Sequence, residues 1–215
     1  IPANKVTAII GKSGSGKSTL TDLVIGLIKP FEGSVLMDGK PQNSFSLASL
    51  RKSISYVSQQ PLIFTGTIFE NIKYAIPNAD TKEVIKASKE ASAHEFILKL
   101  PLKYYSRLSE GGSNLSGGER QRIMLARAFL AKKSFILLDE ATSSVDIESE
   151  NQINEVIKKK IRKKNTTIVI IAHRISTIKN ADNIIILENG TVINQGSPKE
   201  LMYDESWYRK MIEDK

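Results

Sequence analysis

The sequence predicts an α/β fold with a mainly parallel sheet and an inserted α-helical subdomain. Three observations point to this class. Continuous apolar runs at residues 6–10, 135–138 and 167–171 are typical of buried strands. Helical patterns separate these runs, and alternating strands and helices are typical of a parallel sheet. Residues 66–131 carry helical signals and no convincing strand, so we expect a helical insertion there.

Shorter signals predict the other core elements. They are a helix at 20–28, a strand and turn at 33–39, a short helix at 47–52, a strand at 54–57, a long helix at 147–164 and a helical tail at 198–215. Asn189-Gly190 lies between the segments 183–187 and 191–194, which is a strong hairpin signal.

Within the insertion, capping signals place two helices. Asp80 precedes an apolar face and has Glu83 three residues on, as in a capping box. Ser116 begins a second helix. The residues expected to share a buried face are Val84, Ala87, Ser88 and Ala91 in the first helix, and Ile123, Ala126 and Leu130 in the second. We therefore expect one domain, with an α/β core at 1–62 and 132–215 and a helical subdomain at 63–131.

The composition limits the class of protein. The chain has 215 residues, 40% of them hydrophobic, which is enough for one sizeable core. It has no cysteine, which excludes disulfides and thiol chemistry and fits a reducing compartment. No apolar stretch approaches the length of a membrane span and no signal peptide is visible, so we expect a soluble domain. Because the first residues run almost directly into a strand, we expect the chain to be part of a longer protein.

The net charge is +8, and much of it lies in the Lys- and Arg-rich residues 158–164. Such a run can contact nucleic acid or anionic lipid. A solvated helix face is the favoured interpretation, because Glu155 and Lys159 stand four residues apart and can pair along a helix.

A glycine-rich stretch at residues 11–19 matches the phosphate-binding pattern G-x-x-x-x-G-K-[ST]. It lies between a predicted strand and a predicted helix, which is the context the pattern needs. Its glycines let backbone amides face a phosphate at a helix N-terminus. Lys17 is placed to reach the β- and γ-phosphates of a nucleotide, and Ser18 to bind Mg²⁺. A glycine- and serine-rich turn without a ligand is the alternative, which this context disfavours.

Two carboxylates follow the apolar run at 135–138. Ligands of α/β sheets bind beyond the C-terminal ends of the strands, so Asp139 is expected near the Mg²⁺ of a bound nucleotide. Glu140, one residue further, can polarise a water for in-line attack on the γ-phosphate. Acidic strand ends are common, and this signal becomes strong only beside the phosphate loop.

The segment Leu-Ser-Gly-Gly-Glu at 115–119 combines a helix cap with two glycines. Ser116 and Glu119 form an S-x-x-E capping box. The cap does not explain Gly117 and Gly118, because glycine weakens a helix start. Glycines beside a capped N-terminus suit close approach of a phosphate to backbone amides. Because the chain already has one phosphate loop, a second anion site suggests a nucleotide shared with another copy.

On these motifs the chain resembles the nucleotide-binding domain of an ATP-binding cassette (ABC) transporter, whose core is a RecA-like P-loop NTPase fold. Residues 11–19 match the Walker A loop, 115–119 the family signature and 135–140 Walker B. The likeness runs nearly end to end, and signature and Walker motifs in this order are highly specific.

Further loops extend the resemblance. Residues 143–146 resemble the D-loop, Gln59 the Q-loop glutamine and His173 the switch histidine. Alone, Gln59 can simply end a strand and His173 can be an ordinary polar residue. The forms of residues 172–177 and 64–72 are similar to exporters.

The resemblance implies a mechanism in which two such domains, identical or different, pair head to tail and enclose ATP. It implies Glu140 as general base, with Lys17, Gln59 and His173 as further catalytic residues, and Asp146 as a link between the two sites. The implied nucleotide-binding residues are Gly11, Ser13, Gly14, Ser15, Gly16, Lys17, Ser18, Thr19, Ser116, Gly117, Gly118 and Asp146. The implied Mg²⁺ ligands are Ser18, Gln59 and Asp139.

It also implies partners and a location. The helical subdomain would receive coupling helices of a transmembrane domain near residues 59–72, at the cytoplasmic face of the cell membrane. We expect no nucleic acid partner. The alternative, an ABC-type ATPase acting on chromosomes or in DNA repair, suits the basic charge but lacks the coiled coil such chains insert between Lys17 and Asp139. A non-hydrolysing nucleotide binder is a third possibility, which Glu140 and His173 disfavour.

One feature departs from the family pattern. The family usually places an aromatic residue that stacks on adenine before the glycine loop, and residues 1–10 contain none. The early antiparallel strands that carry it are also missing from this stretch. We therefore expect weaker ATP binding than in a chain with these strands.

Overall fold

The computed structural model describes residues 1–162, 166–172 and 174–204. Two compact units make up the chain. The sheet unit comprises Ile1–Tyr56, Ser134–Asp139 and Asn165–Lys215, and the helical unit comprises Val57–Lys133 and Glu140–Lys164. The predicted subdomain at 63–131 lies within the helical unit. In the described part of the chain, no helix is both long and apolar enough to span a bilayer.

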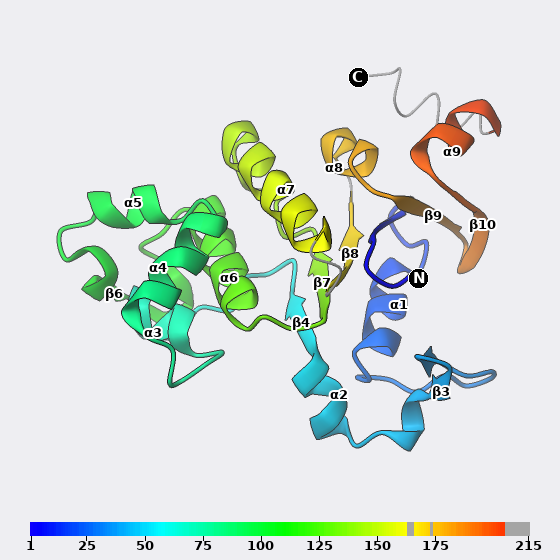
Figure 1. The fold of residues 1–215 in the computed structure, drawn as a ribbon, viewed down its shortest axis with the longest axis horizontal. Helices are drawn as coiled ribbons and strands as arrows, with labels where there is room; N and C mark the ends of the chain where they lie inside the picture. The colour runs from blue at the N-terminus through cyan, green and yellow to red at the C-terminus, as the bar shows by residue number, and fades with distance from the viewer. Residues whose placement is uncertain (163–165, 173, 205–215) are drawn as a thin grey trace. The chain divides into compact units, whose positions relative to one another are not determined.

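A six-stranded sheet forms the centre of the sheet unit, in the order β10-β9-β1-β8-β7-β4 (Figure 1). The pairs β9–β1, β1–β8 and β8–β7 are parallel, whereas β10 is antiparallel to β9. The mainly parallel sheet predicted from the sequence is thus confirmed. Its strands are β1 (Val6–Ile10), β4 (Ile54–Val57), β7 (Phe135–Asp139), β8 (Thr167–Ile171), β9 (Asn183–Glu188) and β10 (Thr191–Gly196).

The apolar runs predicted as strands are buried because helices and loops cover the sheet. Ile9, Leu137 and Val169, from three neighbouring strands, belong to one core cluster and are almost fully buried. A parallel sheet requires such coverage, since both of its faces are apolar.

The hairpin predicted around Asn189-Gly190 is present between β9 and β10. Both turn residues have positive φ, 48° at Asn189 and 77° at Gly190. A two-residue turn of this kind matches the twist of the paired strands, which explains the choice of residues.

The first helix differs from the prediction at both ends. α1 is Lys17–Val24, not 20–28. It begins earlier because Gly16 takes a left-handed conformation directly before Lys17. It ends earlier because Gly26 is left-handed, with φ 71°, and its N–H bonds back to the Leu23 carbonyl.

The rest of the first segment is close to expectation. The strand predicted at 33–39 is reduced to β2 (Leu36–Met37), which pairs with β3 (Lys40–Pro41). A short 3-10 helix, η1 (Gln42–Ser44), leads to α2 (Leu47–Ser53), which was predicted at 47–52. Gln42 donates to the carbonyls of Leu23 and Val24 and thereby secures the end of α1.

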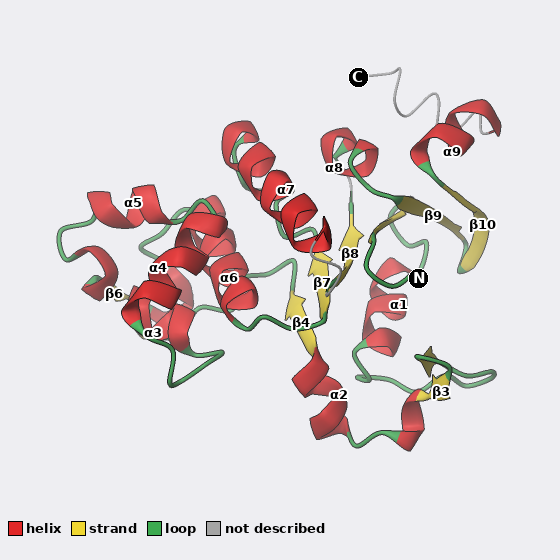
Figure 2. Cartoon of the chain, viewed as in Figure 1, coloured by secondary structure: helices red, strands yellow, loops and turns green. Residues whose placement is uncertain are grey.

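The helical unit contains most of the remaining helices, red in Figure 2. Its elements are α3 (Ile68–Lys73), α4 (Thr81–Glu90), α5 (His94–Lys99), η2 (Lys103–Tyr105), η3 (Glu110–Gly112), α6 (Gly117–Leu130) and α7 (Ile147–Arg162). The capping boxes predicted at Asp80 and Ser116 are both formed, and the faces predicted to be buried are buried.

The sequence indicated no strand in residues 66–131, and this was wrong in one detail. β5 (Gly66–Thr67) pairs with β6 (Arg107–Leu108) as a two-residue antiparallel ladder. Strands this short leave no periodic pattern in a sequence.

The basic residues of the long helix were predicted to form a solvated face. Two of its lysines differ in this respect. Lys158 pairs with Glu155 at 3.1 Å on the surface. Lys160 instead bonds Glu90 at 2.8 Å and lies over the Phe129 ring, so it joins α7 to α4 and α6. Beyond this helix, the structure describes α8 (Ile175–Lys179) and α9 (Pro198–Asp204), and the rest of the predicted helical tail lies outside the described residues.

Candidate functional site

The phosphate loop joins β1 to α1 in the sheet unit. Gly11 is required there, because a Cβ atom on it would lie 2.3 Å from the Leu187 carbonyl oxygen. The turn of the β9–β10 hairpin fixes the middle of the loop, since the Gly190 N–H donates to the Ser15 carbonyl at 3.0 Å. Strand β1 and the hairpin therefore determine the path of the loop from both sides.

Two polar side chains of the loop are buried. Lys17 is 8% exposed, and its Nζ donates to the carbonyls of Gly11 at 2.8 Å and Lys12 at 2.9 Å. The Ser15 hydroxyl is buried and has no hydrogen-bond partner among the described residues. Such a group costs about 1–3 kcal/mol unless it is satisfied. A loop that buries an ammonium and an unsatisfied hydroxyl suits an anion that accepts their hydrogen bonds.

Asp139 lies at the same edge of the sheet as this loop. In the register of the sheet, Asp139 is paired with Ile171, and Ile171 with Ile9, two residues before Gly11. Its Oδ2 accepts a hydrogen bond from the Tyr56 hydroxyl at 3.3 Å. Burial, and then the charge of Asp139, raise the pKa of Tyr56 to about 12. Tyr56 thus remains a neutral donor beside the carboxylate at physiological pH.

In the helical unit, Glu140 and Gln59 are in contact. Gln59 Nε2 donates to Glu140 Oε2 at 3.0 Å. Glu140 has a φ of 48°, a left-handed conformation that is unfavourable for a side chain of this size. Strain of this kind persists only where surrounding contacts impose it, and it is concentrated at functional sites.

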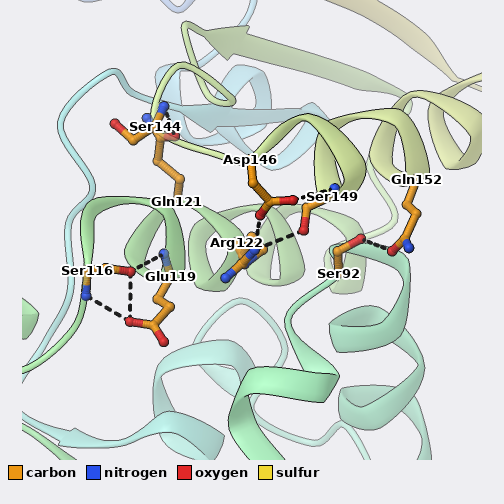
Figure 3. Close-up of polar contacts among 9 residues, drawn as sticks. All are labelled: Ser92, Ser116, Glu119, Gln121, Arg122, Ser144, Asp146, Ser149 and Gln152. Carbon is orange, nitrogen blue, oxygen red and sulfur yellow. Dashed lines mark hydrogen bonds and ion pairs between the residues drawn. The ribbon is translucent and has the colours of Figure 1, made fainter.

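The signature turn, residues 115–119, leads into helix α6, and its start is capped and accessible. The Ser116 N–H and hydroxyl both donate to Glu119 Oε2 at 2.8 Å, and the Glu119 N–H donates back to the hydroxyl, as Figure 3 shows. Ser116 is exposed, while Gly117 and Gly118 are partly exposed. The turn is therefore available to a ligand or to a second protein surface.

The two glycines of the turn have different structural reasons. A Cβ atom on Gly118 would lie 2.5 Å from the Ser144 carbonyl oxygen, so packing inside the helical unit already requires glycine. At Gly117 the nearest atom would be 3.4 Å away, which is an ordinary contact. Packing within the helical unit therefore explains Gly118, and it does not require glycine at position 117.

Asp146 caps α7 and pairs with Arg122 of α6, the helix that begins at the signature turn and is called the signature helix below. Its Oδ1 accepts from the Ser149 N–H at 2.8 Å, and its Oδ2 is 2.8 Å from Arg122 Nη1 (Figure 3). The Ser149 backbone hydrogen bond lowers the pKa of Asp146, and Arg122 adds to this effect. Asp146 is therefore ionised and fixed at neutral pH.

The structure groups the predicted residues in two sets. Residues 11–19 and Asp139 belong to the sheet unit, whereas Gln59, Glu140, Asp146 and the signature turn belong to the helical unit. His173 lies outside the described residues. Sequence reasoning missed Tyr56, Gln121 and Arg122, whose partners are 83, 22 and 24 positions away. No local signal marks contacts of such long range.

A sequence model described as "ABC transporter" matches residues 1–143. The chain therefore belongs to the ABC transporter family. This confirms the family that the order of the motifs indicated.

Individual relatives are similar over almost the whole chain. An uncharacterised ABC transporter ATP-binding protein, y4gM of Sinorhizobium fredii, is 42% identical over 212 residues, which are 99% of this chain and 36% of that protein. The leptomycin B resistance protein pmd1 of Schizosaccharomyces pombe is 40% identical over 221 residues, covering 99% of this chain and 16% of that protein.

A solved structure, of a bacterial Atm1-family ABC exporter with ATP bound, has a TM-score of 0.95 and 36% identity, and covers all of this chain and 37% of that one. The chain thus spans little more than a third of these relatives, or less. Multidrug and Atm1-type exporters among the relatives give no support to the alternative of an ATPase acting on nucleic acid.

Proposed function

We propose that this chain binds and hydrolyses ATP between two copies arranged head to tail, and thereby powers export of a substrate across a membrane. The names of its relatives, which include exporters and drug resistance proteins, support the transport role. The phosphate loop carries the proposal, because its buried Lys17 and its unsatisfied Ser15 hydroxyl suit the phosphates of a nucleotide. The loop residues that would hold the phosphates are Gly11, Ser13, Gly14, Ser15, Gly16, Lys17, Ser18 and Thr19.

Glu140 is the proposed general base. Its carboxylate takes a proton from a water, whose oxygen forms a bond to the γ-phosphorus while the bond from that phosphorus to the bridging oxygen breaks. The products are inorganic phosphate and ADP. The hydrogen bond from Gln59 supports this assignment, because it orients the Glu140 carboxylate at the end of β7. Lys17 stabilises negative charge on the phosphates, and His173 is proposed to hold the γ-phosphate.

Mg²⁺ is a proposed companion of the nucleotide. Ser18, Asp139 and Gln59 supply hydroxyl, carboxylate and amide oxygens, the donor types that this hard cation prefers. The described residues contain no cluster of three or more acidic or histidine side chains that could hold a metal. A site with one carboxylate fits Mg²⁺, which is bound largely through water and substrate phosphates, and the ion would neutralise phosphate charge.

A second copy of the domain is the proposed partner at the nucleotide. The exposed Ser116 and the unexplained Gly117 support contact with the other copy's ATP, with Gly118 beside them. Asp146, held by Arg122, is proposed to connect the two sites.

The proposed contact with the membrane domain, at the cytoplasmic face, is the segment 59–72. Leu62 at 60% and Tyr74 at 66% exposure place apolar side chains on the surface in and beside it. Arg127 of α6 restrains this segment, because it donates to the carbonyls of Asn71 at 2.8 Å and Leu62 at 3.0 Å. Burial lowers the pKa of Arg127 to about 10, so it stays charged at neutral pH.

Phosphate release tests the catalytic assignment. We expect the wild type to release phosphate from ATP and Glu140→Gln to bind ATP but hydrolyse it at least about 100-fold more slowly, since loss of a general base costs about 10²–10⁴-fold. The amide keeps the shape of the side chain and cannot take the proton. Equal rates for the two proteins would remove Glu140 from this role.

A further inference from the structure

A buried amide on the signature helix contacts the turn that carries Glu140. Gln121 is 2% exposed. Its Nε2 donates to the Glu140 carbonyl at 3.3 Å and to the Ser143 hydroxyl at 3.0 Å. Its Oε1 accepts from the Ser144 N–H at 2.9 Å. Figure 3 shows Gln121 extending from α6 to Ser144.

These hydrogen bonds restrain the backbone of the turn at Glu140, where it is strained. The carbonyl that Gln121 contacts belongs to Glu140, whose φ of 48° needs outside support. Buried, satisfied amides are rigid, because leaving any of their groups unpaired in the interior is costly. Gln121 is thus a candidate for holding the Glu140 backbone in this conformation.

The same helix holds the far end of the turn. Arg122 bonds Asp146 at 2.8 Å and the Ser149 hydroxyl at 2.9 Å, and its guanidinium lies over the Phe96 ring. Gly118 packs directly against the Ser144 carbonyl. The first two turns of α6 and residues 140–149 therefore form one connected piece of structure.

We propose that Gln121 is a positioning residue for hydrolysis, which fixes Glu140 from the signature helix. The inference rests on the proposed function. Its consequence is a link between two nucleotides. The start of α6 at Ser116 contacts the ATP of the partner copy, whereas Glu140 acts on the ATP held by its own copy. Gln121 connects the two within a single chain.

Two substitutions of similar size test the role of the amide. Gln121→Met removes all three hydrogen bonds, and Gln121→Glu keeps an acceptor for the Ser144 N–H but loses both donors. In the full-length protein we expect both to lower kcat for ATP hydrolysis by about 10- to 100-fold, because small misplacement of a reacting group has effects of that size. We expect KM for ATP to stay within about twofold, since the phosphate loop is unchanged.

Gln42→Met is the matched control. Gln42 also donates its amide to two backbone carbonyls, at 3.0 and 2.9 Å, but these belong to α1. We expect this variant to lose thermal stability and to keep its kcat. All rates are measured below the melting temperature and per folded molecule.

The possible results distinguish a failure of the proposed function from a failure of the inference about Gln121. If the wild type releases no phosphate, the proposed function fails. If the wild type is active and Gln121→Met keeps its kcat and loses only stability, Gln121 has a structural role and the inference is wrong. If Gln121→Glu alone retains wild-type kcat, the donors to Glu140 and Ser143 are dispensable, which also overturns it.

Discussion

Single residues at the strand ends occupy unfavourable environments that the fold nevertheless maintains. The Ser15 hydroxyl is buried without a partner among the described residues, and Glu140 has a left-handed backbone. Each such feature costs about 1–3 kcal/mol. Glu140 follows strand β7 directly, and Ser15 follows strand β1 after a short loop. The ends of such strands are where an α/β sheet binds its ligands. Their position favours function over packing as the explanation.

Tyr56 provides a prediction at this scale. Burial and the nearby Asp139 raise its pKa to about 12, above its usual 10. The folded state thus holds the phenol proton more tightly than the unfolded chain. The stability that this contributes is complete below pH 10, and it is lost as the pH rises from 10 through about 12. An absorbance titration of the phenolate measures that pKa when the curve of Tyr56→Phe is subtracted from the curve of the wild type.

The control is Asp139→Asn, which removes the charge beside the Tyr56 hydroxyl and should lower the pKa of Tyr56. A Tyr56 transition at the ordinary pKa of a phenol would contradict the hydrogen bond to Asp139.

Most residues of the proposed site could be chosen from the sequence, because Lys17, Asp139 and Glu140 belong to compact local motifs. Tyr56 and Gln121 could not. Each is a common residue type without a motif, and its importance comes from a partner on a distant segment that only the folded chain brings close.

Helix starts are the best determined features at the scale of elements. Among the described residues of the helical unit, three helices have complete capping boxes, at Thr67, Asp80 and Ser116. A cap satisfies N–H groups at the first turn through residues three positions apart, so it can be recognised from a few letters. Helix α1 lacks a side-chain cap and begins at a left-handed glycine, and there the predicted boundary was wrong.

Two caps of the same type give a paired prediction. Ser116→Ala and Asp80→Ala should each lower the free energy of unfolding by about 1 kcal/mol, because each removes a capping side chain. Chemical denaturation measures this. Only Ser116→Ala should also slow ATP hydrolysis, because Asp80 caps a helix that is outside the proposed site. A similar loss of activity in both variants would mean that stability alone determines the rate.

At the scale of the whole molecule, the residues proposed to act on ATP are divided between two units and two copies. Residues 11–19 lie in the sheet unit, and Ser116 lies at an exposed turn of the helical unit. A nucleotide that contacts both kinds of surface, on different copies, would hold the copies together. Association should therefore depend on the nucleotide.

We expect the 215-residue chain with Glu140→Gln to sediment as a monomer without nucleotide and as a dimer with ATP and Mg²⁺. Blocking hydrolysis preserves the γ-phosphate that both copies contact. The same chain carrying Lys17→Ala as well should remain monomeric, because its phosphate site is lost. A dimer that forms equally without ATP would contradict a nucleotide-built interface.

The sequence by itself determined the family, the α/β class, the strands β1, β7 and β8 and the residue types of the proposed site. These depend on local order, that is, on apolar runs, glycine spacing and capping patterns. Only the tertiary structure decided that Gly118 is required by the Ser144 carbonyl, that Lys160 joins three helices and that Gln121 holds the turn at Glu140. Those facts are contacts between distant segments, and such segments meet only when the whole chain packs into its folded state.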